Sequence, residues 1–206
     1  LKAEEDPLVN GDGSIQWLRW EIHPWLSSDG GVGGIVLFSE DITRRVVAEQ
    51  QLRKLSLAVE QSPESIVITD LQGRIEYVND TFLRVTGYSR EEVLGANPRV
   101  LQSGRTPREH FASLWDCLTR GETWTGEFFN RRKDGSEYVE FAIIAPLRQV
   151  DGEITHYVAI KEDITERKQL AAELESHRHH LEELVAQRTA ELAVAKAGAE
   201  AANVAK

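Results

Sequence analysis

The sequence has 206 residues, of which 34 are acidic and 24 are basic, giving a formal net charge of −10. A protein that neutralises several phosphates needs a surplus of lysine and arginine on some face, and no segment has one, so we expect no nucleic-acid partner. No apolar run approaches the roughly 20 residues that a bilayer requires, so we expect no membrane span in this segment. Cys117 is the only cysteine, which excludes an internal disulfide and favours a reducing, cytoplasmic location.

An internal repeat organises the chain. Asp12-Gly13-Ser14 recurs as Asp134-Gly135-Ser136, and Glu40-Asp41-Ile42-Thr43 recurs as Glu162-Asp163-Ile164-Thr165, both at an offset of 122 residues. A period of this length suits a small domain rather than a solenoid unit. We therefore expect the last part of one domain and a complete second copy. Because the sequence opens with Leu1, we also expect it to be a piece of a longer protein.

The second copy has the pattern of an α+β domain. Its segments between Asp-Gly turns are rich in β-branched and aromatic residues, which favours antiparallel hairpins. The expected elements, in chain order, are strands at 65–70 and 74–78, short helical stretches near 79–94, a helix at 107–120, and strands at 137–149 and 153–162. Together they predict a five-stranded antiparallel sheet with helices on one face.

Two further segments predict long amphipathic, coiled-coil-like linker helices. Small and apolar side chains recur at 3–4 spacing in residues 42–60 and 164–192. These side chains are Ala48, Leu52, Leu55 and Val59 in the first segment, and Leu170, Leu174, Leu181, Leu184 and Leu192 in the second. We expect a parallel homodimer through these helices, weakened by His177 and Arg188 at seam positions. A single helix docked on its own domain is the alternative.

The repeat unit resembles a known family. The run 65–78, the stretch from Asn79 to Gly95, the hairpin Asn130 to Gly135 and the closing Asp163-Ile164-Thr165 resemble a PAS sensory domain with its C-terminal PAC motif. Residues 12–45 resemble a second PAC motif. The resemblance implies the PAS fold but not a ligand, since PAS domains host haem, flavins, small acids or nothing.

By this resemblance the chain has four parts. These are the C-terminal part of a truncated first PAS domain (1–43), a linker helix (44–60), a complete PAS domain (61–165) and an output helix (166–206). Residues 184–206 resemble the connector that precedes the phosphoacceptor helices of bacterial sensor histidine kinases and hybrid kinases. We therefore expect a sensory region whose kinase domain follows in the same chain.

The expected region has no enzymatic activity of its own, because neither a phosphoacceptor box nor an ATP-lid motif occurs in these residues. A ligand-free dimerisation and relay spacer is one alternative function. The input module of a nucleotide cyclase is another.

One segment points to a flavin. Residues 95–102 resemble the flavin-binding run of light-oxygen-voltage PAS domains, with Pro98 in place of the reactive cysteine. Without that thiol a light-driven cysteinyl adduct is excluded. Residues 106–135 are more similar to flavin-containing redox PAS domains, with which they share Leu-Trp, a second Trp, Gly and Asn-Arg-Arg-Lys-Asp.

The resemblance implies roles for four residues toward FAD or FMN. Trp115 and Trp124 flank the ring, Asn130 hydrogen-bonds its polar edge, and Asn97 holds the side chain of the cofactor. The alternative is structural: both tryptophans are core aromatics and Asn130 caps a hairpin. An unidentified small ligand and an empty domain also stay open.

Other candidate sites are weaker. His110 is the only histidine on the predicted 107–120 helix, where haem PAS domains carry their axial ligand, but a surface histidine is the commoner case and we expect no haem. His177 and His180 have a metal-chelating spacing without a third ligand, so we expect a solvated helix face and no metal. Glu140 and Lys161 could pair inside the sheet, but strand alternation favours solvent-facing side chains.

The closing motif is the expected signal relay. Asp163 and Glu166 have the N-cap and N3 spacing of a capping arrangement, and Arg167 lies four residues after Asp163, within reach of an ion pair. We therefore expect Asp163, Thr165 and Arg167 to join the strand end to the output helix. A plain helix cap is the alternative.

Overall fold

The computed structural model of the protein describes residues 1–204, so residues 205 and 206 of the predicted output segment lie outside the described residues. Side chains are described for residues 1–189, 191 and 192. The chain divides into two compact units, and the boundary in the sequence lies between Gln61 and Ser62. Within the described residues, no helix combines the length and the apolar character needed to cross a membrane.

The first unit is a three-stranded antiparallel sheet followed by a helix. Strands β1 (Lys2–Val9), β2 (Ile15–Leu26) and β3 (Val32–Asp41) pair in that order, and helix α1 spans Thr43–Glu60. Every strand bound recurs in the second unit 122 residues later, as does the residue at which the helix begins. The first unit therefore corresponds to the last three strands and the following helix of the second unit.

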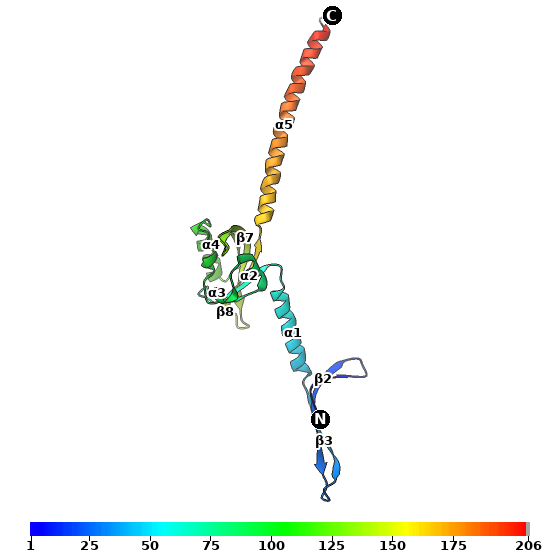
Figure 1. Ribbon diagram of the computed structural model, residues 1–206. Helices are drawn as coiled ribbons and strands as arrows, with labels where there is room; N and C mark the ends of the chain where they lie inside the picture. The colour runs from blue at the N-terminus through cyan, green and yellow to red at the C-terminus, as the bar shows by residue number, and fades with distance from the viewer. Residues whose placement is uncertain (205–206) are drawn as a thin grey trace. The chain divides into compact units, whose positions relative to one another are not determined.

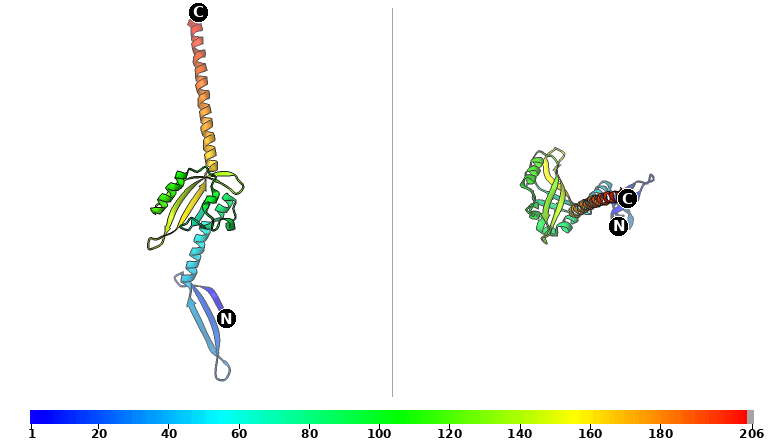
Figure 2. Two further views of the ribbon diagram at one scale, coloured as in Figure 1. Left: turned by 90° about the vertical axis from the view of Figure 1, so that its left-hand side faces the viewer. Right: turned by 90° about the horizontal axis from the view of Figure 1, so that it is seen from above.

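The second unit confirms the predicted α+β fold. Its elements are β4 (Ser65–Thr69), β5 (Ile75–Val78), α2 (Asp80–Thr86), α3 (Arg90–Val93), the 3₁₀ helix η1 (Pro98–Leu101), α4 (Arg108–Thr119), β6 (Trp124–Arg131), β7 (Glu137–Arg148), β8 (Ile154–Asp163) and α5 (Thr165–Val204). The five strands form one antiparallel sheet in the order β5-β4-β8-β7-β6. Helices α2, α3 and α4 cover one face of it (Figures 1 and 2).

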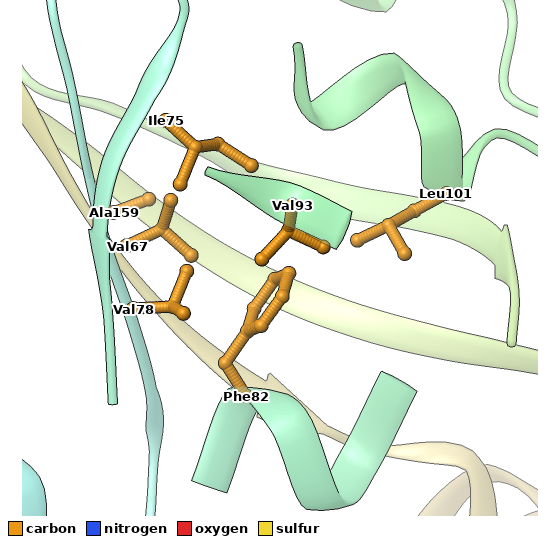
Figure 3. Packing of buried hydrophobic residues seen from close by; sticks show 7 residues of the cluster. All are labelled: Val67, Ile75, Val78, Phe82, Val93, Leu101 and Ala159. Atoms are coloured by element: carbon orange, nitrogen blue, oxygen red, sulfur yellow. The ribbon is translucent and has the colours of Figure 1, made fainter. Parts of the chain in front are cut away.

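One core cluster joins the β5 side of the sheet to the short helices. Phe82 of α2, Val93 of α3 and Leu101 of η1 meet the side chains of β4, β5 and β8 (Figure 3). Asn79 is fully buried and starts α2, because its Oδ1 accepts from Phe82 N at 3.1 Å. Its amide nitrogen donates to Glu64 O at 2.9 Å, so the same side chain ties the helix start to the strand β4 region.

A second core cluster lies under α4 on the β6 side of the sheet. Leu114 and Leu118 lie one turn apart on the helix, so both face the sheet, where they meet Trp124, Phe128 and Ala142. The sequence placed a proline in the first turn of this helix. In the structure that proline is the N-cap residue immediately before Arg108, where its missing N–H costs no intrahelical hydrogen bond.

Removing the largest side chain of the first cluster should destabilise the second unit. Phe82 is 1% exposed, and we expect Phe82→Ala to lower its free energy of unfolding by about 3–5 kcal/mol. Urea unfolding followed by hydrogen exchange in peptides from residues 137–163 measures this unit alone. Val150→Ala in the exposed β7–β8 turn is the control, with a change below about 0.5 kcal/mol. Equal effects of the two substitutions would contradict the assigned core.

Candidate functional site

A cavity of about 350 Å³ lies between the two core clusters, against the helix-covered face of the sheet. Its walls are mainly apolar and include Val67, Leu114, Leu118, Phe128, Ile144 and Ala159. Polar side chains also line it, among them Gln102, Asn130, Glu140 and Lys161. Flat apolar walls with a few fixed polar groups are typical of a small-molecule site.

Three of the four predicted cofactor residues line this cavity, namely Trp115, Asn130 and Asn97. Trp115 is 41% exposed, and its ring meets Tyr157 edge-to-face at 6.0 Å between ring centroids. Asn130 is buried on β6 beside the backbone of Gln102, with which it forms an isolated bridge. The structure therefore brings together an aromatic side chain in contact with solvent and a buried amide.

The side chain of Asn97 is already hydrogen-bonded within the protein. Its Nδ2 donates to Gly73 O at 2.9 Å, and its Oδ1 accepts from the backbone N of Arg99 at 3.1 Å, which caps η1. Gly73 has φ of +74° and a Cβ there would lie 2.9 Å from Asn97 Nδ2, so this turn requires glycine. The predicted contact of Asn97 with a cofactor would compete with these bonds.

Trp124 does not line the cavity, unlike the other three predicted residues. It is 5% exposed, and its ring lies over Gly126, where an added Cβ would come within 2.3 Å of it. It also packs on Phe128 with 5.1 Å between ring centroids and meets His110 edge-to-face. This position matches the alternative that the sequence left open for Trp124, a core aromatic.

Glu140 and Lys161 form an ion pair inside the domain, which corrects the expectation that they face solvent. Lys161 Nζ lies 2.6 Å from Glu140 Oε1, and the residues are 7% and 3% exposed. Alternation correctly placed Tyr138, Glu140 and Ala142 on one face of β7, but that face is the one the helices cover. The error arose because both faces of β7 carry apolar residues, so the pattern alone does not identify the buried face.

The Tyr138 hydroxyl contacts Glu140, one of the polar residues that line the cavity. It donates to Glu140 Oε2 at 3.2 Å, and Tyr138 is 2% exposed. Burial raises the pKa of this hydroxyl well above its ordinary value, and the negative charge of Glu140 raises it further, whereas a hydrogen bond with Asn130 acts in the opposite direction. Tyr138 therefore stays protonated and donates to Glu140.

The predicted relay residues Asp163 and Thr165 form a hydrogen-bonded corner between β8 and α5. Asp163 Oδ1 accepts from Thr165 N at 3.0 Å and from Thr165 Oγ1 at 2.6 Å. Thr165 Oγ1 in turn accepts from Val139 N at 2.9 Å, and Ile164 N donates to Val139 O at 2.9 Å. The corner therefore ties the helix start to β7 as well as to β8.

Two predicted contacts of the relay differ from the structure. Asp163 pairs with Arg132, whose Nη2 lies 2.7 Å from its Oδ2, and Arg167 pairs with Glu162 at 3.4 Å instead. Helix α5 begins at Thr165, so Asp163 lies one residue before the N-cap position and the predicted capping arrangement with Glu166 is absent. The Asp163 carboxylate accepts hydrogen bonds from Arg132 and Thr165, and Arg167 pairs with Glu162 of the same strand instead.

The family follows from these elements and from comparison with known proteins. The sequence profile described as "PAS domain" matches residues 63–166, and one described as "PAS fold" matches residues 3–47. The chain belongs to the PAS family. Its second unit, from β4 to the start of α5, is referred to below as the PAS unit.

Proteins similar to the chain include a regulatory protein and a receptor. The chain is 39% identical over 119 residues to the nitrogen fixation regulatory protein of Klebsiella oxytoca, covering 58% of this chain and 24% of that protein. It is 36% identical over 105 residues to the aerotaxis receptor of Escherichia coli, covering 51% of this chain and 21% of the receptor. The chain thus spans about a quarter of the length of these relatives.

A solved structure, described as an RNA-binding light-oxygen-voltage receptor, has the same fold. It superposes with a TM-score of 0.55 at 26% sequence identity, covering 78% of this chain and 44% of that one. The proteins to which the chain is similar thus include an aerotaxis receptor and a light-oxygen-voltage receptor.

Among the described residues, no three His, Cys, Asp or Glu side chains are grouped as they would be around a metal ion. His110 meets the ring of Trp124, and His179 pairs with Glu183 along α5. These histidines take part in ordinary packing and surface contacts.

Sequence reasoning gave no role to Arg132 and Tyr138, which contact Asp163 and Glu140. Arg132 lies in the Asn-Arg-Arg-Lys-Asp motif, and Tyr138 shares a strand face with Glu140, so both signals were present in the sequence. Neither signal identifies the partner, because Arg132 pairs with a residue 31 positions later. Gln102 was also missed, although it lies at the end of the run 95–102.

The buried ion pair gives a prediction about stability. Lys161→Met should lower the free energy of unfolding by about 3–5 kcal/mol, because it leaves the Glu140 carboxylate buried without its counter-charge. Adding Glu140→Leu should restore most of this loss, since both charges are then gone. Urea unfolding of the single and double variants measures the difference. A double variant less stable than Lys161→Met alone would show that the pair is not the reason for the loss.

Proposed function

We propose that this chain is the sensory region of a bacterial sensor histidine kinase or hybrid kinase, in which the PAS unit detects a redox state or a small ligand and relays it through α5. The supporting observation is the cavity, which lies against the same strands that end at the α5 corner. Similarity to sensory relatives supports the same role. The kinase itself would lie in a further part of the same polypeptide.

A flavin is the ligand class that the cavity fits best. A flat aromatic ring matches the walls formed by Leu114, Phe128 and Ile144, and its edge of alternating acceptors and donors matches the amide of Asn130. Bound FAD or FMN would supply reversible electron transfer. Trp115 would cover the ring at the opening, and Lys161 would place a positive charge near its polar edge.

Redox or ligand sensing fits this site better than light-driven thiol chemistry. Pro98 lines the cavity at the position where the light-oxygen-voltage pattern has cysteine. Cys117 lies on α4, where its neighbours are the second core cluster and Arg120, whose Nη2 is 3.6 Å from the sulfur. Cys117 is therefore placed for packing and not for attack on a bound ring.

The output is proposed to pass through a dimer of helices. Leu170, Leu174, Leu181 and Leu184 of α5 are 41–71% exposed, and Leu52 and Leu55 of α1 are 68% and 64% exposed. Apolar side chains at this spacing are buried when two parallel copies associate. The ligand-free spacer remains the alternative function, and it is favoured by one observation: Asn97 and the Glu140–Lys161 pair are already satisfied within the protein.

Uptake of flavin tests the proposal. The purified chain should be yellow or should become yellow with added FAD or FMN, and Trp115→Ala should weaken this binding about tenfold or more because the ring loses its cover. Visible absorbance and equilibrium dialysis measure it. Trp25→Ala in the first unit is the matched control and should bind as the unchanged chain does. A colourless chain that takes up neither flavin would favour the ligand-free spacer.

The pose of the flavin can be tested by restoring the missing thiol. Pro98→Cys should make the visible absorbance of the flavin-loaded chain bleach reversibly in blue light, because the sulfur would then lie beside the ring. The unchanged chain should not bleach in this way. Cys117→Ser in the same background is the control and should leave the bleaching in place. A light-stable Pro98→Cys variant that still binds flavin would exclude this pose.

A further inference from the structure

Polar contacts lead without a break from the cavity to the start of α5. Lys161 pairs with one oxygen of Glu140 at 2.6 Å, and the Tyr138 hydroxyl donates to the other oxygen at 3.2 Å. The guanidinium carbon of Arg132 lies 4.4 Å from the centroid of the Tyr138 ring, and its Nη2 donates to Asp163 at 2.7 Å. Cavity and helix start are thus joined by five side chains in contact.

We propose that Arg132 couples the polar end of the cavity to the start of α5, with Tyr138 as the intermediate contact. The proposal rests on the proposed sensory function and names the residues that carry its signal. A ligand edge that displaces Lys161 shifts Glu140 and the Tyr138 ring, and Arg132 transfers the shift to Asp163. Arg132 does not line the cavity, so it is a positioning residue.

The first unit shows that the corner forms without these contacts. Asp41 Oδ1 accepts from Thr43 N at 2.9 Å, and Thr43 Oγ1 accepts from Trp17 N at 2.8 Å, as their counterparts do at the start of α5. The residues at the positions equivalent to Arg132, Tyr138, Glu140 and Lys161 are Asn10, Gln16, Leu18 and Ser39. The four residues are therefore not needed to begin a helix after this motif, and they occur in the copy that has the cavity.

The charges of this set are placed so that each affects the others. Glu140 and Asp163 are directly opposite each other on β7 and β8, where two like charges repel. Lys161 compensates one carboxylate and Arg132 the other, so a change at either cation alters the field at both. Glu140 and Lys161 are buried, so solvent screens their interaction little, whereas Arg132 is partly buried and Asp163 is exposed.

The position of Arg132 also lowers the stability of the fold, because one of its donor atoms is buried without a partner among the described residues. Its Nη1 is buried and has no hydrogen-bond partner in the described part of the chain. An unsatisfied buried donor destabilises a fold by about 1–3 kcal/mol or more. The corner of the first unit forms with asparagine at this position, and there Asp41 Oδ2 accepts from Gln16 Nε2 at 2.9 Å instead.

A double-mutant cycle on the ligand-free chain tests the coupling. The four proteins are the unchanged chain, Glu140→Gln/Lys161→Gln, Arg132→Gln, and their combination. Hydrogen exchange of the backbone amides of residues 165–172 is the readout. With Arg132 present, neutralising the pair should speed this exchange about threefold or more, and with Arg132→Gln it should add little. The start of α1, residues 43–50, is the internal control and should exchange equally in all four proteins.

Two comparisons decide the outcome. Additive effects of the changes at residues 165–172 would overturn the coupling, as would no effect of neutralising the pair. If Arg132→Gln raises exchange throughout β4 and β8, the cycle is repeated with Tyr138→Phe, which keeps the ring and removes the hydroxyl. Tyr138→Phe should then abolish most of the coupling between the ion pair and residues 165–172. Because no ligand is used, a chain that binds no flavin can still show the coupling, and a flavin-binding chain can still lack it.

Discussion

The hydroxyl of Thr165 joins β7, β8 and α5 of the PAS unit by hydrogen bonds. It donates to Asp163 at the end of β8, accepts from the backbone of Val139 in β7, and belongs to the first residue of α5. These bonds satisfy groups that the end of a strand and the start of a helix would otherwise leave without partners. Since β7 and β8 also form one wall of the cavity, the helix cannot change its angle without strain reaching that wall.

Much of the fold was predictable because its determinants are local. Asp-Gly turns and β-branched runs are set by residues a few positions apart, and they correctly predicted a five-stranded antiparallel sheet with helices on one face, without a range for β6. The family resemblance placed Trp115 and Asn130, which the structure puts beside the same cavity. The repeated motif forms the same corner twice, because its Asp, Ile and Thr residues make equivalent bonds in both units.

What could not be predicted depends on contacts between distant segments. Alternation groups Glu140 with Tyr138 but does not say which face the helices cover, and this is fixed only when α4 packs on the sheet. The partner of Asp163 comes from the β6–β7 turn, so sequence proximity wrongly favoured Arg167. Trp124 was assigned to the ligand by analogy, whereas the glycine at 126 leaves room for its ring in the core.

The equal offset of the two copies has a consequence for how such proteins are assembled from parts. Strand bounds, corner bonds and helix starts coincide after a shift of 122 residues. In a gene fusion made directly after the Asp-Ile-Thr tripeptide, the hydrogen bonds of the corner would come from residues before the fusion point. They would therefore not depend on which helix follows. The contacts that cross this point, Arg167 with Glu162 and Lys168 with Glu127, are the ones that a fused helix would have to match.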